Sequence, residues 1–206
     1  MPRFDEYLES VPVTPATLTT ERLVLRPLVS TDADAVFAAC QDPDIQRWTA
    51  TPVPYEYEHA ERWVNDVTPA GWREGTFCNL GSFDTDTGAL VSSVVPGSIR
   101  RAERIADVGF WTVRRWRGRG YTVEAVRAIA EWAFTELGME RLTWMADVDN
   151  VASRAVAERV GFTIEGLLRA QLLSRGTRRD AWVGSLLPSD LGLDAEHPYL
   201  PAGIDR

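Results

Sequence analysis

The sequence predicts one mixed α/β domain with a central, mostly antiparallel sheet. Two strand-like stretches, 76–83 and 89–95, flank residues 84–88, which are rich in the Asp, Thr and Gly of a β-hairpin turn. Farther along the chain, apolar residues recur at helical spacing from Val123 to Leu137. Antiparallel strands followed by strands that alternate with helices indicate a single sheet covered by helices.

The composition is that of a folded globular protein. The length of 206 residues suits one domain, and 45% apolar with 25% charged residues is ordinary. No apolar run approaches the roughly 20 residues of a membrane helix, and the start lacks a secretory signal, so we expect a cytoplasmic protein that does not enter membranes. The net charge of −8 argues against nucleic acid as a partner. All 22 basic residues are arginine, which excludes Schiff-base and Walker-loop lysine chemistry.

The chain divides into a domain with two terminal additions. Residues 1–18 contain three prolines and little periodicity, and we expect an irregular N-terminal arm. Residues 19–188 form the predicted domain. Residues 189–206 are expected to be an irregular C-terminal tail.

The first half of the domain starts with a strand and a helix. Residues 22–26 alternate as a half-buried strand does, and Pro27 ends the strand. Ser30 is the expected N-cap of a helix that runs to about residue 40, with Asp32 and Asp34 in its first turn. A further helix is expected over 56–67, before the hairpin.

The second half alternates strands with helices. A strand over 105–113 precedes the long helix, which Gly138 ends. The remaining elements expected are a strand over 142–146, a helix that starts at the cap Asn150 and stops at Gly161, and two final strands over 162–173 and 179–187.

The run from Arg114 to Tyr121 joins the strand at 105–113 to the long helix and carries Gly118 and Gly120. A helix N-terminus exposes unpaired N–H groups with partial positive charge, and glycine lets a ligand approach the backbone closely. We therefore expect a pyrophosphate here, with a plain turn as the alternative. A Rossmann loop needs a third glycine where Val123 stands, and a Walker loop needs lysine.

The pattern Arg115-x-x-Gly118-x-Gly120 resembles the pyrophosphate loop of the GNAT acetyltransferases, (Gln/Arg)-x-x-Gly-x-Gly/Ala. Further stretches similar to the RimJ/RimL-like branch of that family are 109–111, 121–125, 150–153 and 160–162. The resemblance spans about residues 20–188. It implies a GNAT-like domain in which two parallel strands, 105–113 and 142–146, splay apart around the pantetheine arm of acetyl-CoA.

The resemblance also implies residue roles around the cofactor. Backbone groups from Trp111 to Val113 are expected to hold the pantetheine, and the Val113 amide to polarise the thioester carbonyl. Asn150 caps its helix and contacts the pantetheine, with a cap alone as the alternative. Ser153 donates a proton to the departing thiolate. The cofactor-binding residues expected in the loop are Arg115, Arg117, Gly118, Arg119, Gly120, Tyr121 and Thr122, with the phosphates on the backbone amides from Arg117 to Thr122.

An acceptor amine must lose a proton before it attacks, and a nearby carboxylate is the usual base. Asp107, on the cofactor strand, is the candidate, with Glu103, Asp147 and Asp149 as alternatives. Trp48 is the candidate substrate contact, with core packing as its alternative role.

The two cysteines and two histidines show no metal-ligand spacing, so we expect no metal site. The resemblance predicts an N-acetyltransferase that moves an acetyl group from acetyl-CoA to a primary amine by direct attack in a ternary complex. The acceptor is expected to be a protein N-terminal α-amine or a small-molecule amine, and a homodimer is left open. A catalytically inactive CoA-binding module with a regulatory or assembly role is the alternative.

Overall fold

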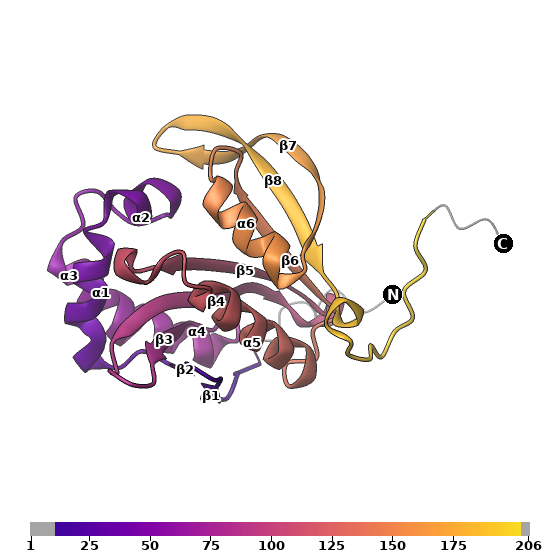
Figure 1. Ribbon diagram of the computed structural model, residues 1–206, viewed down its shortest axis with the longest axis horizontal. Coiled ribbons are helices and arrows are strands. Elements are labelled where there is room, and N and C mark those ends of the chain that lie inside the picture. Colours follow the sequence, from indigo (N-terminus) through magenta and orange to yellow (C-terminus); the bar gives the residue numbers. More distant parts are fainter. Residues whose placement is uncertain (1–10, 203–206) are drawn as a thin grey trace.

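The computed structural model describes residues 11–202 and contains one central eight-stranded sheet (Figure 1). The strands are β1 (Leu18–Thr19), β2 (Leu23–Arg26), β3 (Leu80–Asp84), β4 (Leu90–Arg100), β5 (Ile105–Thr112), β6 (Arg141–Asp147), β7 (Thr163–Ser174) and β8 (Thr177–Leu186). Their order in the sheet is β1-β2-β3-β4-β5-β6-β8-β7. Neighbouring strands run antiparallel except for β5 and β6, which are parallel.

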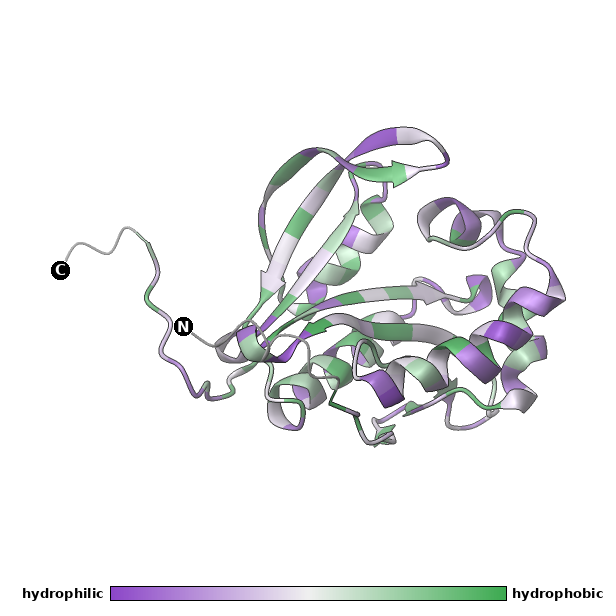
Figure 2. Cartoon of the chain, turned by 180° about the vertical axis from the view of Figure 1, so that it is seen from behind, coloured by the Kyte–Doolittle hydropathy of each residue, from purple (hydrophilic) through white to green (hydrophobic). Residues whose placement is uncertain are grey.

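Helices cover the sheet and connect its strands. They are α1 (Ala33–Cys40), α2 (Pro43–Trp48), α3 (Tyr57–Arg62), α4 (Thr68–Glu74), α5 (Tyr121–Thr135) and α6 (Val151–Val160). The helices carry both hydrophilic and hydrophobic residues (Figure 2), and α5 packs its apolar side into the main core with Val126 and Ile129 fully buried. Within residues 11–202, none of these helices has the length and apolar character needed to cross a membrane.

The two parallel strands separate halfway along their length. Pairing between β5 and β6 runs from Ile105↔Arg141 to Val108↔Trp144 and stops there, whereas β5 continues beside β4 as far as Thr112. Parallel neighbours need a long crossover, which α5 provides here. The sheet therefore opens between the C-terminal halves of β5 and β6.

Most of the expected elements are confirmed. The mixed α/β class, the hairpin of β3 and β4, the long helix α5 and the splayed parallel pair all occur. Gly138 has φ 67° just beyond α5, and Gly161 has φ 120° at the end of α6. Asn150 caps α6 by accepting a hydrogen bond from the Ser153 amide at 3.1 Å.

The expected start of the first helix is wrong. Val29 rather than Ser30 is the N-cap of the first turn, and the Asp32 carboxylate accepts a hydrogen bond from the Val29 amide at 2.8 Å, as the third residue of a capping box does. The Ser30 hydroxyl instead bonds the Asn65 side chain at 2.7 Å. A single 3-10 turn at Ser30–Asp32 therefore precedes α1.

The region before the hairpin is more helical than expected. The helix predicted over 56–67 continues through a π-helical turn, Trp63–Val67, into α4 and ends at Gly75, whose φ is 66°. The short α2 was not expected, although Asp42 caps it through the Asp44 amide and Pro43 occupies its first turn.

The terminal additions lie partly outside the described residues, which exclude 1–10 and 203–206. Residues 11–17 of the expected arm form no helix or strand, yet Val13 is buried and its amide donates to the Trp72 carbonyl at 2.9 Å. The arm thus packs on the domain, and its last residue, Leu18, already pairs with β2. In the tail, Pro188–Leu191 forms a 3-10 turn.

Candidate functional site

A cavity of about 300 Å³ lies where β5 and β6 begin to separate. Three strands line it with Val95, Gly97, Asp107, Val108, Gly109, Thr143 and Met145. Gly97, Asp107 and Thr143 are register partners across the three strands, so they share one face of the sheet. Gly109 is exposed, and no atom lies within 4 Å of the position that a Cβ would take there.

Asp107 presents its carboxylate to this cavity. Alternation along β5 turns Ala106 and Val108 into the core beneath α5 and leaves half-buried Asp107 on the opposite face. No hydrogen bond or ion pair within residues 11–202 involves its carboxylate. Asp107 is therefore a carboxylate at the cavity without a partner among residues 11–202.

The alternative carboxylates are already engaged. Asp147 accepts a hydrogen bond from Arg179 at 2.9 Å, and that contact lowers the pKa of Asp147. Asp149 pairs with the same guanidinium, and Glu103 pairs with Arg100 at 3.0 Å. The geometry thus favours Asp107 among the four candidates.

The backbone amides of β5 alternate between β4 and the opening. The Val113 amide was expected to polarise the thioester carbonyl. It donates instead to the Val91 carbonyl of β4 at 2.9 Å and is therefore not available. In an antiparallel pair every second residue points its N–H to the partner. The Trp111 amide therefore also points to β4. The amides of Phe110 and Thr112 point toward the opening, because both residues lie beyond the last pair of β5 with β6.

The loop before α5 supplies a row of unpaired amides. Gly118 and Gly120 have φ of 74° and 82°, and Glu124 is the first residue of the helix whose amide is bonded, to the Gly120 carbonyl at 3.1 Å. Along the described chain, no hydrogen bond uses the consecutive amides from Gly118 to Val123. The Arg117 amide, included in the expected set, donates to the Arg114 carbonyl at 3.3 Å. An anion at this helix start finds its donors from residue 118 onward.

Arg117 ties this loop to α2. Its Nε donates to the Thr112 carbonyl at 3.0 Å, and its terminal nitrogens pair with Asp42 and Asp44 at 3.0 Å each. Its guanidinium is therefore paired within the fold, and the backbone amide of Arg117, from which the cofactor contact was expected, is the one bonded to the Arg114 carbonyl.

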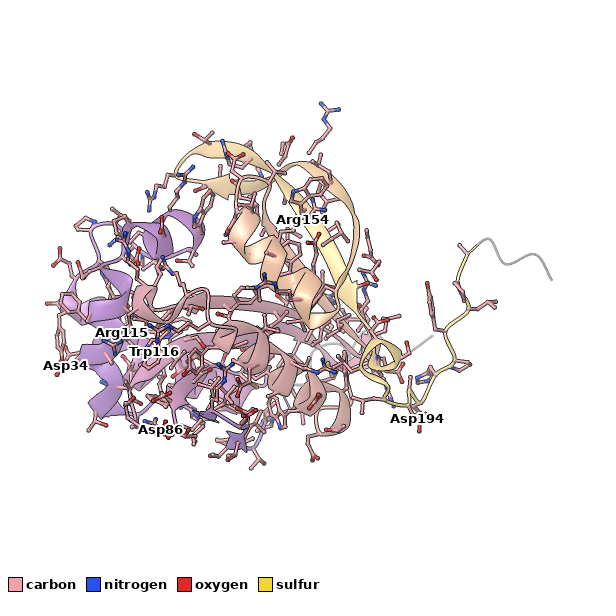
Figure 3. The ribbon with its side chains drawn as sticks, viewed as in Figure 1. Asp34, Asp86, Arg115, Trp116, Arg154 and Asp194 are labelled. Carbon is pink, nitrogen blue, oxygen red and sulfur yellow. The ribbon has the colours of Figure 1, made fainter. Side chains whose placement is uncertain are left out.

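Two other loop arginines lie over an aromatic ring. The guanidinium carbons of Arg115 and Arg119 are each 5.7 Å from the centroid of the Trp116 ring. Figure 3 shows Arg115 and Trp116 together near the end of the molecule that carries α1 and α3. Both arginines are exposed and lie beside the free amides, so they add positive charge there.

Tyr121 and Thr122 fix the helix to the sheet through their side chains. Thr122 is buried and its hydroxyl lies 2.6 Å from the Thr112 hydroxyl. The Tyr121 hydroxyl donates to Asp84 at 3.3 Å, and burial together with that carboxylate raises the pKa of Tyr121. Both hydroxyls are thus engaged within the fold, whereas the backbone amides of Tyr121 and Thr122 have no partner among residues 11–202.

Glu124 was not singled out by the sequence, yet it anchors the start of α5. It accepts hydrogen bonds from the Thr20 hydroxyl at 2.6 Å and from Arg22 Nε at 2.7 Å. Burial alone raises the pKa of Glu124, but these hydrogen bonds outweigh it and the pKa is lowered. An acidic residue in a first helical turn was the available signal, whereas its partners on the N-terminal segment were not predictable from spacing.

Ser153 lies on α6 and faces β6. Its hydroxyl oxygen accepts a hydrogen bond from the Trp144 indole at 3.0 Å, and Trp144 is only 1% exposed. The bond orients the hydroxyl and leaves its own proton to be donated. Asn150 uses its side-chain oxygen as the cap of α6, so its NH₂ group remains for a ligand.

Trp48 is the last residue of α2. It is half-buried, and the Arg47 guanidinium stacks over its ring at 4.2 Å. Arg179 and, from α2, Arg47 both lower the pKa of Asp147. Trp48 is not among the residues that line the cavity beside Asp107.

The two cysteines are buried free thiols. Burial raises the pKa of Cys40 to about 11 and that of Cys78 to about 12, so both remain thiols at neutral pH. No cluster of three or more metal-ligating side chains occurs in the part of the chain that the structure describes.

Comparison with known proteins identifies a family. A family model described as "Acetyltransferase (GNAT) domain" matches residues 22–163, more than half of the chain. YoaA of Bacillus subtilis, an uncharacterized N-acetyltransferase, is 27% identical over 171 residues, which cover 82% of this chain and 96% of that protein.

Two solved structures share the fold. RimJ of Mycobacterium smegmatis in complex with CoA-disulfide has a TM-score of 0.74 and 22% identity, and the match covers 88% of this chain and 90% of that one. RimL, a ribosomal L7/L12 alpha-N-protein acetyltransferase in complex with coenzyme A, has a TM-score of 0.76 and 19% identity, covering 84% and 98%.

Proposed function

The chain belongs to the GNAT acetyltransferase family, and we propose that it transfers an acetyl group from acetyl-CoA to a primary amine by direct attack in a ternary complex. The observation that carries the proposal is the run of unpaired amides from Gly118 to Val123 at the start of α5. A helix start with free N–H groups suits a pyrophosphate, and the positive φ of Gly118 and Gly120 keeps side chains out of its approach.

The pantetheine arm is proposed to lie in the opening between β5 and β6. There the edge of β5 offers the amides of Phe110 and Thr112 and the carbonyl of Phe110 on one side, whereas the Thr112 carbonyl already accepts from Arg117 Nε. The NH₂ group of Asn150 supports the arm from the other side. The amide of Phe110 or Thr112 is proposed as the oxyanion donor. The Val113 amide, expected in that role, is bonded to β4.

Asp107 is proposed as the general base. It takes a proton from the protonated acceptor amine, whose nitrogen then attacks the thioester carbonyl carbon. The new N–C bond forms as the C–S bond breaks, and the sulfur leaves as a thiolate. The second amine proton passes to solvent.

The thiolate receives its proton from the Ser153 hydroxyl, and solvent restores that proton. Trp144 is a positioning residue in this step, because its indole holds the hydroxyl oxygen. A thiol with pKa near 8.5 leaves readily, so the gain from Ser153 is modest.

The acceptor is proposed to be a protein N-terminal α-amine or a small-molecule amine. The solved neighbour RimL bears the name of an enzyme that acts on a protein α-amine, which makes such an amine the first acceptor to test. Half-buried Trp48 and the cavity beside Asp107 are the proposed acceptor contacts.

Release of free thiol from acetyl-CoA, measured with a panel of peptides and amines, tests the proposal. Mass spectrometry of the product identifies the acetylated group. Asp107→Asn should lose turnover while coenzyme A binding, measured by calorimetry, is retained. If coenzyme A binds and no acceptor gives turnover above hydrolysis, the chain is a binding module, and the acetyl-transfer proposal is refuted.

A further inference from the structure

Arg22 reaches the loop before α5 from the N-terminal part of the chain. Its Nη1 donates to the Arg119 carbonyl at 3.1 Å, and its guanidinium carbon lies 4.2 Å from the centroid of the Tyr121 ring. Arg119 lies between the two glycines of the loop, Gly118 and Gly120. The contact therefore holds the backbone within the run of unpaired amides, although 97 positions separate Arg22 from Arg119 in the sequence.

Arg22 is itself held through its backbone and its side chain. Its backbone carbonyl accepts hydrogen bonds from the Thr85 amide at 3.0 Å and from the Thr85 hydroxyl at 3.2 Å. Its Nε and Nη2 pair with the Glu124 carboxylate at 2.7 and 2.5 Å. The same carboxylate accepts from the Arg22 amide at 3.0 Å and from the Thr20 hydroxyl at 2.6 Å. The guanidinium thus has a fixed position from which Nη1 meets the Arg119 carbonyl.

The contact at Arg119 decides which way the next amide points. In a trans peptide, the carbonyl of one residue and the N–H of the following residue point in opposite directions. Because the Arg119 carbonyl points to Arg22, the Gly120 N–H points away from that guanidinium. No hydrogen bond among residues 11–202 uses this N–H, so it is available to a ligand on the other side of the peptide.

Glycine at position 120 makes this orientation easy to lose. Gly120 has φ 82°, and glycine adopts positive and negative φ about equally well. The peptide between Arg119 and Gly120 can therefore turn over unless a contact holds its carbonyl. After such a rotation, a carbonyl oxygen would replace one N–H in the row of amides, and its partial negative charge would repel a phosphate.

The pair of Arg22 with Glu124 also affects the charge at the helix start. Glu124 lies in the first turn of α5, where the free amides attract an anion, and an unpaired carboxylate there would oppose that anion. Both partners are partly shielded from water, with side chains 38% and 18% exposed. Pairing with Arg22 therefore neutralises the Glu124 carboxylate close to the proposed phosphate site.

We propose that Arg22 is a positioning residue for acetyl-CoA. It holds the Arg119–Gly120 peptide so that the Gly120 N–H faces the pyrophosphate, and it does not itself contact the cofactor. Glu124 keeps the guanidinium in place for this task. The inference rests on the part of the proposed function that places the pyrophosphate at the start of α5.

Arg22→Lys is the variant that tests this role. Lysine keeps a positive charge beside Glu124, but its single ammonium group does not reproduce the fork of nitrogens that bonds the carboxylate and the Arg119 carbonyl at once. Arg22→Ala removes both contacts. Circular dichroism and Tm establish that each variant is folded before its binding is measured.

Arg26→Lys is the matched control, because Arg26 lies on β2 and has the same kinds of partner. It pairs with Asp32 at 2.7 Å, and its guanidinium carbon lies 3.8 Å from the centroid of the Phe83 ring. The backbone carbonyl that it holds is that of Pro27, at 3.0 Å, and not one in the loop before α5. A loss that follows from any arginine of this strand would therefore appear in the control as well.

Two ligands separate a role at the phosphates from a general loss of structure. Coenzyme A carries the pyrophosphate, whereas pantetheine lacks it, and the Kd of each is measured by isothermal titration calorimetry. We expect Arg22→Lys and Arg22→Ala to bind coenzyme A about tenfold more weakly than wild type, in keeping with one lost hydrogen bond to a charged group. The Kd of pantetheine should be unchanged, and the control should bind both ligands as wild type does.

The Gly120 amide itself provides a direct readout. In protein labelled with ¹⁵N at glycine, coenzyme A should shift the Gly120 amide signal of wild type and of Arg26→Lys. The same signal should not shift in Arg22→Lys at a coenzyme A concentration that saturates that variant.

Wild-type affinity for coenzyme A in folded Arg22→Lys and Arg22→Ala overturns the positioning role. Wild-type affinity in Arg22→Lys alone also overturns it, because the charge beside Glu124 would then suffice. Equal weakening of coenzyme A and pantetheine, or an equal loss in the control, has the same consequence. If wild type binds no coenzyme A, the proposed function fails together with this inference, whereas binding without acetyl transfer refutes the proposed function alone.

Discussion

Replacing Gly120 by alanine tests whether the backbone at the start of α5 holds the phosphates. Gly120 has φ 82°, and a Cβ built there lies 3.5 Å from Arg22 Nη2, an ordinary contact distance. The cost to folding is therefore mainly the left-handed backbone, about 1–2 kcal/mol for an L-residue. For a chain of this size, that cost corresponds to a fall in Tm of about 2–8 °C.

The effect on binding should be larger than this stability cost suggests. The added methyl group occupies the path by which a phosphate approaches the amides around residue 120. Loss of one hydrogen bond to a charged group is worth about 1.5–3 kcal/mol. Coenzyme A should therefore bind about 10- to 100-fold more weakly, as measured by isothermal titration calorimetry.

Gly138→Ala is the control, at the other end of the same helix. Gly138 has φ 67°, and no atom lies within 4 Å of its Cβ position, so the backbone penalty is matched without a ligand nearby. Urea unfolding should give similar losses of stability for the two variants. If Gly120→Ala binds coenzyme A within twofold of wild type, or if Gly138→Ala weakens binding equally, the phosphates do not lie on this backbone.

Three further outcomes are expected. Asp107→Asn should lower kcat about 100-fold at pH 7 with the Kd of coenzyme A unchanged, and normal turnover would move the base elsewhere. Ser153→Ala should lower kcat by less than about tenfold, since a thiolate leaves readily. Trp144→Phe should lower kcat to a similar extent. A larger loss in Trp144→Phe alone would indicate a folding defect, which a lower Tm of that variant would reveal. Arg179 lowers the pKa of Asp147, so that carboxylate stabilises the fold above the unfolded pKa of about 4 and loses this contribution as pH falls through the lower folded pKa. Urea unfolding of wild type and Asp147→Asn should therefore differ at pH 7 and converge toward pH 3, and a difference that grows in acid would contradict the assignment.

Local sequence chemistry was sufficient for the elements that frame the site. The helical spacing of apolar residues and the glycine at 138 predict α5, and Asn150 with Gly161 delimits α6, because capping and left-handed turns involve near neighbours in the chain. The start of α1 could not be predicted in the same way. Serine is a common cap, but the Ser30 hydroxyl donates to the distant Asn65 side chain, and the Asp32 carboxylate bonds the Val29 amide.

The same distinction between local and long-range contacts applies to the loop between β5 and α5. The sequence alone determined that a strand, two glycines and a helix succeed one another. The first amides of a helix have no partner within the helix, and glycine at the cap supplies no side chain to bond them. Only the tertiary structure decided which amides and charges are available. The Val113 amide is bonded to β4, Arg117 is bonded to α2, and Asp107 is the candidate carboxylate without a partner within residues 11–202. These outcomes depend on hydrogen bonds between distant segments, which spacing along the chain does not encode.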